Sequence, residues 1–306
     1  MFRVTPVLIL VAVGLAGVTV AAQRGQGPPP LIRENATEKI SEHVYVIPDN
    51  NVGMVPNVGI IVGTRGTFIV DTGMGARNAE TIMKEVAKVS KTPELYIAST
   101  HIHPEHDLGA HGFPAHAKMI RSQDQLKEIA ATGLQTAKVF SGFSPLNAEL
   151  LQGADFRKAD ITYEKEHTVD LGGVRVRTIA MGTNHTMGDQ AFFVEGDAVL
   201  FSGDVAMIAL PGVNPQATMA TWIQSQDRFL ALQPKRIVPS HGAMGGTEIV
   251  TNYKEFLTTV RTRATELKKQ GKTVDETVST LQDELQKRWP DRQRMASAIR
   301  AAYNNQ

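Results

Sequence analysis

The chain has 306 residues, of which 42% are hydrophobic and 21% charged, and its 32 basic and 31 acidic side chains leave a formal charge of +1. This length allows one large domain or two small ones, and the composition is ordinary for a soluble globular protein. No basic stripe with interleaved aromatic residues occurs, so nucleic acid is not expected as a partner.

Residues 1–22 have the pattern of a secretory signal peptide. Arg3 supplies one positive charge, residues 7–20 are almost wholly apolar, and Val20-Ala21-Ala22 offers small residues for cleavage. This apolar run is short for a membrane span, which needs about 20 residues, although an uncleaved anchor stays open as the alternative. We expect a periplasmic or secreted protein with no membrane segment after cleavage.

The segment after the signal peptide, residues 23–41, is expected to be a linker because its first part is rich in Gly and Pro. Beyond it, short runs rich in β-branched residues predict strands, and apolar residues at helical spacing predict helices. Strands are expected at 44–47, 58–62, 67–70, 94–100, 174–180, 191–194, 198–202 and 236–239, helices at 76–89, 123–132 and 217–232, and an irregular stretch at 133–160.

This alternation of strands and helices predicts an α/β fold with two similar halves, in which two sheets pack face to face and the helices lie outside. From about Glu248 the chain is predicted to be helical, because Phe256, Val260, Ala264 and Leu267 form one apolar stripe. We expect this tail to cover the core or to form a homodimer surface.

A cluster of possible metal ligands follows the predicted strand at 94–100. In extended backbone His101 and His103 face the same side, Glu105 continues that face, and a turn at Pro104 brings His106 inward. Cysteine is absent, so a transition metal must be bound by imidazole and carboxylate groups of this kind.

Three further candidates each follow a predicted strand: His185 after 174–180, Asp204 after 198–202, and His241 after 236–239. One such residue alone is typical of a capped turn. Four strand-end sites in one α/β chain indicate a single rim, where sheets of this kind bind their ligands.

Five motifs, taken together, resemble the metallo-β-lactamase superfamily. They are strand–Asp–Thr–Gly at 68–73, His-x-His-x-acid-His at 101–106, Gly-x-x-His-Thr-x-Gly-Asp at 182–189, Ser-Gly-Asp at 202–204 and His-Gly at 241–242. The resemblance spans about residues 42–242. The motifs are specific for a fold and its metal site, and they carry little information about the substrate.

The resemblance implies an αβ/βα four-layer sandwich at 42–245 with a C-terminal helical extension at 246–306. It also implies two Zn²⁺ ions per chain. His101, His103 and His185 would hold the first, Glu105, His106 and His241 the second, and Asp204 would bridge them. Asp71 is expected to support the ligand loop by hydrogen bonds, and Asp189 to form a turn or act behind the ligands.

The sequence departs from the family pattern at Glu105, where aspartate is usual. The extra methylene moves the carboxylate by about 1.5 Å, whereas metal–ligand distances tolerate only about 0.2 Å. Glu105 is therefore a ligand with an adjusted rotamer, a base acting through water, or a spectator. Asn184 and Ser240 replace glycines that are frequent in the family.

We expect a zinc-dependent hydrolase that uses a metal-bound hydroxide to cleave an ester, lactone, thioester, β-lactam or similar bond of a small-molecule substrate. Glu105 and Asp204 are the candidate catalytic carboxylates. The alternatives are an iron-dependent oxidoreductase similar to persulfide dioxygenases and a non-catalytic metal-binding protein. The apolar residues Met54, Val55, Pro56, Phe140, Phe143 and Leu146 are expected in the core, with substrate contact as the alternative.

Overall fold

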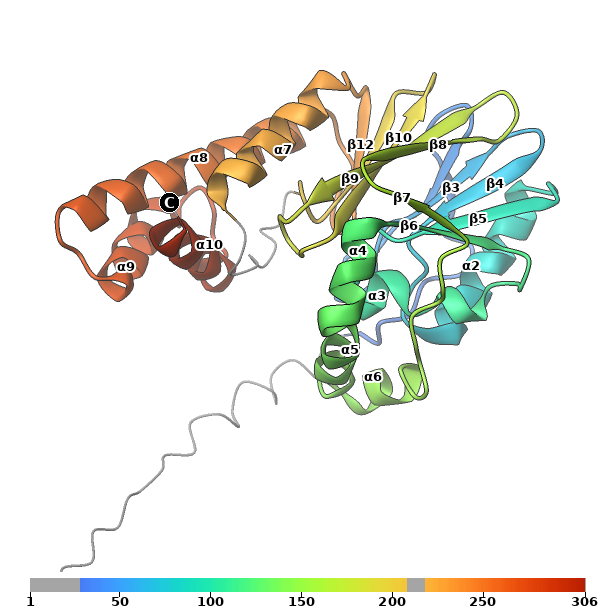
Figure 1. Ribbon diagram of the computed structural model, residues 1–306, viewed down its shortest axis with the longest axis horizontal. Helices are drawn as coiled ribbons and strands as arrows, with labels where there is room; N and C mark the ends of the chain where they lie inside the picture. The colour runs from blue at the N-terminus through green and yellow to red at the C-terminus, as the bar shows by residue number, and fades with distance from the viewer. Residues whose placement is uncertain (1–27, 208–217, 306) are drawn as a thin grey trace, which may run out of the picture.

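The computed structural model describes residues 28–207 and 218–305 (Figure 1). The predicted signal peptide at 1–22 and the first part of the predicted linker lie outside these residues. Among the residues that are described, no helix has both the length and the apolar character that a membrane span requires.

The first half of the chain forms a seven-stranded sheet. The strands follow one another in sequence order, antiparallel from β1 to β4 and parallel from β4 to β7. Every residue of β4 is buried, as expected for a strand covered on both faces. The strands are β1 (Glu38–Lys39), β2 (Val44–Ile47), β3 (Val58–Val62), β4 (Gly66–Val70), β5 (Glu94–Ala98), β6 (Lys118–Ser122) and β7 (Ile161–Tyr163).

The second half forms a five-stranded sheet with the order β12-β11-β10-β9-β8. The pair β11–β12 is parallel, and the other pairs are antiparallel. These strands are β8 (Glu166–Asp170), β9 (Arg175–Gly182), β10 (Asp189–Glu195), β11 (Val199–Gly203) and β12 (Arg236–Pro239). The prediction missed β1, β6, β7 and β8, and β1 places two residues of the predicted linker in the first sheet.

The two sheets pack face to face around a shared core. Phe68 of β4 meets Phe192 of β10 with ring centroids 5.6 Å apart, and both belong to one buried cluster. A Cβ at Gly59 would lie 2.4 Å from the Phe201 ring, so only glycine fits where β3 approaches β11. This inter-sheet cluster fixes the position of each sheet's strand ends relative to the other's.

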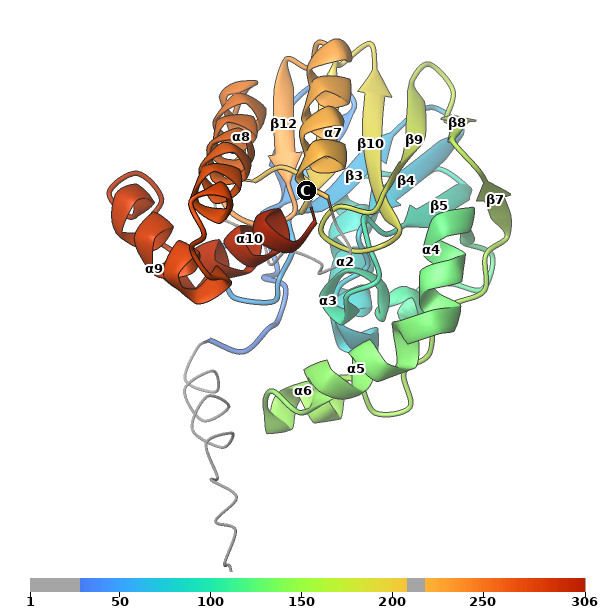
Figure 2. The ribbon, with the colours of Figure 1, turned by 60° about the vertical axis from the view of Figure 1, so that its left-hand side comes forward.

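Helices cover the outer faces, which confirms the predicted αβ/βα four-layer sandwich (Figures 1 and 2). α2 (Gly75–Val89) packs Ile82 and Val86 against the first sheet. α7 (Met219–Ala231) and α8 (Glu248–Lys269) cover the second sheet, followed by α9 (Val274–Leu285) and α10 (Arg292–Asn304).

The predicted stripe of α8 is buried. Phe256, Val260, Ala264 and Leu267 belong to the same core cluster as Ile237 of the second sheet. The tail is therefore helical with a buried apolar stripe, as predicted, and α9 and α10 pack against α8. The homodimer surface stays a prediction.

Short helices follow β5 and β6 at one end of the sandwich (Figure 2). They are α3 (Pro104–Asp107), η2 (Ala110–Gly112), α4 (Gln123–Glu128), the π-helical turn η3 (Ile129–Gly133), α5 (Leu134–Ser141) and α6 (Pro145–Leu150). The irregular stretch predicted at 133–160 is thus wrong over α5 and α6. No residue of α5 is buried, so its sequence lacks the apolar stripe that would have marked it as a helix.

Candidate metal centre

The seven predicted metal ligands meet at one edge of the sandwich. His101 and His103 follow β5, and α3 carries Glu105 and His106. The other three follow later strands: His185 lies between β9 and β10, Asp204 follows β11, and His241 follows β12. They form three overlapping groups whose ligand atoms lie within 4.8 Å of one another: His101/His103/His185, His101/His106/Asp204 and Glu105/His106/His241.

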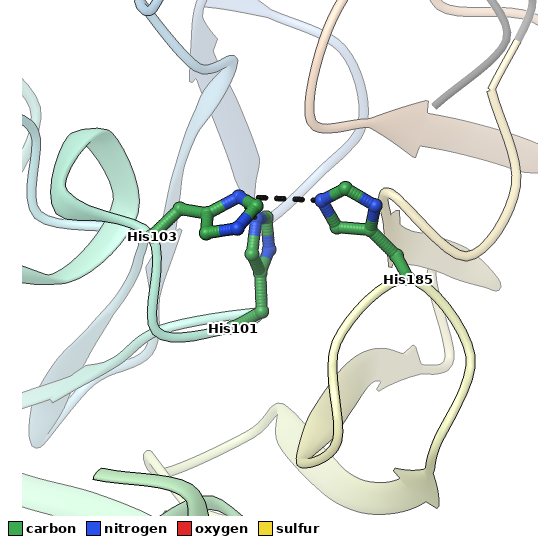
Figure 3. Close-up of side chains that lie close together, drawn as sticks. All are labelled: His101, His103 and His185. Carbon is green, nitrogen blue, oxygen red and sulfur yellow. Dashed lines mark hydrogen bonds between the residues drawn. The ribbon is translucent and has the colours of Figure 1, made fainter. Parts of the chain in front are cut away.

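The first group consists of three imidazole rings from two segments (Figure 3). His103 Nδ1 lies 3.0 Å from His101 Nε2 and 3.3 Å from His185 Nε2. Donor atoms that share a tetrahedral zinc ion at about 2.0–2.1 Å are about 3.3 Å apart. These three nitrogens therefore have the spacing of ligands to one ion.

The second group has similar spacing. His106 Nε2 lies 3.3 Å from His241 Nε2 and 3.8 Å from Glu105 Oε1. The longer side chain of glutamate thus still brings a carboxylate oxygen beside the two rings. This arrangement suits the ligand role more than that of a spectator.

Asp204 lies between the two groups. Its Oδ2 is 3.4 Å from His185 Nε2, and its carboxylate also groups with His101 and His106. Burial favours the neutral carboxyl group, but the surrounding histidines outweigh it and lower the pKa of Asp204 to about 2. Asp204 is therefore an anion at the position that a bridging ligand requires.

Hydrogen bonds to residues outside the ligand groups determine which nitrogen of His106 and of His241 faces the centre. His106 Nδ1 lies 2.9 Å from Asp71 Oδ2, and His241 Nδ1 lies 2.9 Å from the carbonyl oxygen of Val55. An Nδ1–H that donates to these acceptors leaves Nε2 unprotonated for a metal. Burial lowers the pKa of His106, but the Asp71 carboxylate raises it more, to about 9, so a metal that binds Nε2 at neutral pH has to displace a proton from this ring.

Asp71 supports the ligand loop, as predicted. It is fully buried, has a left-handed φ of 66°, and accepts a 2.7 Å hydrogen bond from the Thr100 backbone N–H. A non-glycine residue in this conformation is strained and is held by its surroundings. Asp71 thereby fixes both His106 and the backbone just before His101.

His101 and His103 of the first group are suited to metal binding. Burial, together with the neighbouring histidines, lowers the pKa of His101 and of His103 well below the ordinary value of 6.5. Neutral imidazoles are the form that binds a metal, so no proton has to be displaced from them at neutral pH.

Two buried carboxylate oxygens of the centre, Glu105 Oε2 and Asp204 Oδ1, have no hydrogen-bond partner. Buried polar atoms are nearly always satisfied, and one left alone has a large desolvation penalty. Both atoms belong to the ligand groups described above. The donor types, their spacing and these two orphaned oxygens therefore fit a pair of metal ions.

The loop that carries His185 is held by residues the sequence did not identify as a group. Asp189 accepts hydrogen bonds from the Thr186 backbone and hydroxyl, which is the turn-forming role predicted for it. Glu128 of α4 accepts from the backbone N–H groups of Met187 at 3.0 Å and Gly188 at 2.7 Å. Nothing in the sequence signals this contact, because it joins residues about sixty positions apart.

The two departures from the glycine pattern have local hydrogen bonds. Asn184 is fully buried, accepts from the Ser225 hydroxyl at 2.8 Å and donates to the Met181 carbonyl at 3.1 Å. The Ser240 hydroxyl lies 3.3 Å from that of Thr100. Both side chains support the loops around the centre.

The apolar residues near the centre differ in how far they are buried. Val55 is buried in the core, and Pro56 is buried as well. Met54, Phe140 and Leu146 are only partly buried and pack on a cluster that contains Ile102, the residue between the first two histidines.

Comparisons with known proteins identify the family and the fold. A family profile described as the Metallo-beta-lactamase superfamily matches residues 52–241. The metallo-beta-lactamase type 2 of Bacteroides fragilis is 21% identical over 232 residues, which cover 72% of this chain and 83% of the relative.

Solved structures share the fold. The inverting sec-alkylsulfatase Pisa1 from Pseudomonas sp. matches with a TM-score of 0.68 and 15% identity over 88% of this chain, which spans about half (49%) of the sulfatase. A metallo-beta-lactamase family protein from Thermus thermophilus matches with a TM-score of 0.59 and 18% identity, covering 85% of this chain and 91% of that protein. At these identities the likeness concerns the fold alone.

Proposed function

The chain belongs to the metallo-β-lactamase superfamily, and on this premise we propose that it is a zinc-dependent hydrolase with two metal ions. His101, His103 and His185 would hold the first ion, and Glu105, His106 and His241 the second. Asp204 would contact both. The observation that carries the proposal is the 3.0–3.4 Å spacing of the donor atoms of His101, His103, His185 and Asp204.

The chemistry divides between the metals and the protein. Zinc held by these residues would lower the pKa of a water molecule to about 7 and stabilise negative charge on oxygen. The anionic Asp204 can accept a hydrogen bond at Oδ1, which has no partner, and so orient a water. Burial raises the pKa of Glu105, and its Oε2 also lacks a partner, so this oxygen can accept or return a proton.

We propose that the substrate is a small molecule with an ester, lactone, thioester or β-lactam bond. The relatives motivate two members of a substrate panel, since one is named as a β-lactamase and another as an alkylsulfatase. The pattern of residues 1–22 supports export, so the reaction would take place in the periplasm or outside the cell.

An iron oxidoreductase remains the competing function, because imidazole and carboxylate ligands suit iron as well as zinc. A mononuclear iron site would use the first group and leave Glu105, His106 and His241 without an ion. The matching spacing of this second group favours two metals. Elemental analysis of protein purified without added metal distinguishes the two functions.

The decisive experiment compares His103→Ala with the wild type. We expect the variant to lose one metal per chain and more than about 100-fold of the hydrolytic activity on the panel, because a first-group ligand is removed. His116→Ala is the matched control, since His116 is exposed and outside the three groups. A fully active, fully metallated His103→Ala protein would refute the proposal.

A further inference from the structure

The helix α5 differs from its neighbours in what it leaves uncovered. It carries no buried residue, and its Leu134 and Val139 are 68% and 47% exposed, the two exposed large hydrophobic side chains among the described residues. α5 therefore contributes little to the core, and its partly exposed apolar side chains can contact another molecule.

One residue of α5, Phe140, reaches the metal centre. Its ring lies 5.1 Å from the His103 ring, centroid to centroid, with the planes inclined by 38°. His103 is partly exposed, whereas His101 of the same group is only 1% exposed. Phe140 therefore stands beside the histidine through which the first group meets solvent.

Phe140 is not isolated. The Phe143 ring lies 5.0 Å from it, and Met54 and Leu146 belong to the same cluster. The buried Asn147 side chain connects Phe140 of α5 with Met54 of the loop before β3. Its amide donates to the Phe140 carbonyl at 3.1 Å and contacts Met54 Sδ at 3.4 Å. The loop of Met54 in turn contacts the centre, since the adjacent Val55 carbonyl accepts from His241.

The charges near this wall point to the chemistry of its occupant. Within residues 28–207 and 218–305, no ion pair joins a lysine or arginine to Glu105 or Asp204. The nearby guanidinium of Arg121 is fully buried and committed to both oxygens of Asp107. The side chains described beside the first group are thus aromatic and aliphatic, and the exposed Lys138 of α5 forms no ion pair with Glu105 or Asp204.

We propose that Phe140, with Phe143 and Met54, forms a wall that binds an apolar acyl or alkyl substituent of the substrate. The inference rests on the hydrolase function and narrows it to substrates with several carbons beside the bond that is cleaved. Leu134 lies on the same helix but is 68% exposed and belongs neither to the three groups nor to the cluster around Ile102.

A chain-length series tests the wall. Each methylene buried against it should improve kcat/KM by about fourfold. Zinc-loaded wild type should therefore prefer p-nitrophenyl octanoate to butyrate and butyrate to acetate. Phe140→Ala should lower kcat/KM for the octanoate at least tenfold, mainly through KM, and for the acetate only about twofold. Phe140→Leu should keep most of the preference.

Leu134→Ala is the matched control, because it removes an apolar side chain from the same helix without touching the centre. Equal effects of Phe140→Ala and Leu134→Ala, or a wild type that does not distinguish octanoate from acetate, would overturn the wall. Metal content and circular dichroism of each variant verify folding. If Phe140→Ala does not fold, the chain-length series of the wild type and of Phe140→Leu decides whether the wall binds the substituent.

Binding measured without turnover separates this inference from the hydrolase function. Calorimetry should show that the zinc-loaded protein binds octanoate more tightly than acetate, and that Phe140→Ala loses this difference. Phe140-dependent octanoate binding without hydrolysis of any panel substrate would support the wall and overturn the hydrolase function. Hydrolysis without any dependence on chain length would do the reverse.

Discussion

The molecule adds helices to its sandwich in two places, and the two additions are built differently. The tail α8–α10 buries its apolar residues among its own helices and α7, in a cluster that reaches Ile237 of the second sheet, and no residue of it belongs to the three ligand groups. The run α4–α6 buries little of α5, yet it contacts the centre through Phe140 and holds the His185 loop through Glu128. Apolar residues that are buried in the core indicate a structural role. Partly exposed apolar residues beside a metal centre indicate a surface that binds substrate.

The largest expected effect falls on the tail. Phe256 is 1% exposed and packs edge-on against Trp289 with ring centroids 5.3 Å apart. Phe256→Ala should lower the free energy of unfolding by about 3–5 kcal/mol, because the cavity cannot fully collapse. Urea denaturation measures the loss. Metal content and kcat of the folded fraction should equal those of the wild type. A selective loss of metal would mean that the tail supports the metal centre as α4–α6 does.

A smaller effect on stability, with a specific effect on the centre, is expected at α4. Glu128→Ala leaves the backbone N–H groups of Met187 and Gly188 without an acceptor, which should cost about 2–3 kcal/mol. Metal affinity should fall about 10–100-fold at the group that contains His185, because an outer partner of a ligand loop is lost.

The two sites can be resolved by titrating metal-free Glu128→Ala with Co²⁺ against a chelator. Glu128→Gln is the control, since it retains one oxygen to accept one of the two hydrogen bonds and should lie between the variant and the wild type. If both metals bind Glu128→Ala as tightly as they bind the wild type, α4 is scaffold like the tail.

The smallest effect is expected at the exposed face of α5. Leu134→Ala should change the free energy of unfolding by less than about 0.5 kcal/mol, because the side chain is 68% exposed. Thermal or urea unfolding provides the measurement, with Phe256→Ala as the contrasting variant. A loss of more than about 1 kcal/mol would mean that α5 is packed more like the tail than its exposure indicates.

Sequence patterns recovered the strands whose residues are apolar and missed those that are not. The runs at β2, β3 and β12 were predicted with their observed bounds because burial on both faces demands continuous β-branched residues. β6 contains the fully buried Arg121, which is tolerated only because Asp107 binds its guanidinium. β8 is a largely polar edge strand, so it has no continuous run of apolar or β-branched residues that would have predicted it.

The candidate ligands were predicted from spacing, whereas their supports were not. Asp71 could be foreseen because it stands in a motif of its own. The Val55 carbonyl and the Glu128 carboxylate could not, because a backbone oxygen carries no residue signature and Glu128 resembles any polar helix residue.

By itself the sequence determined the α/β class, the imidazole and carboxylate character of the donors, and their positions after the strands. Only the tertiary structure decided which nitrogen of each ring faces inward and that Phe140 stands beside His103. The physical reason is that local patterns encode burial and backbone conformation. Distances of 3–4 Å between side chains more than a hundred residues apart, such as His106 and His241, depend on how the two sheets pack.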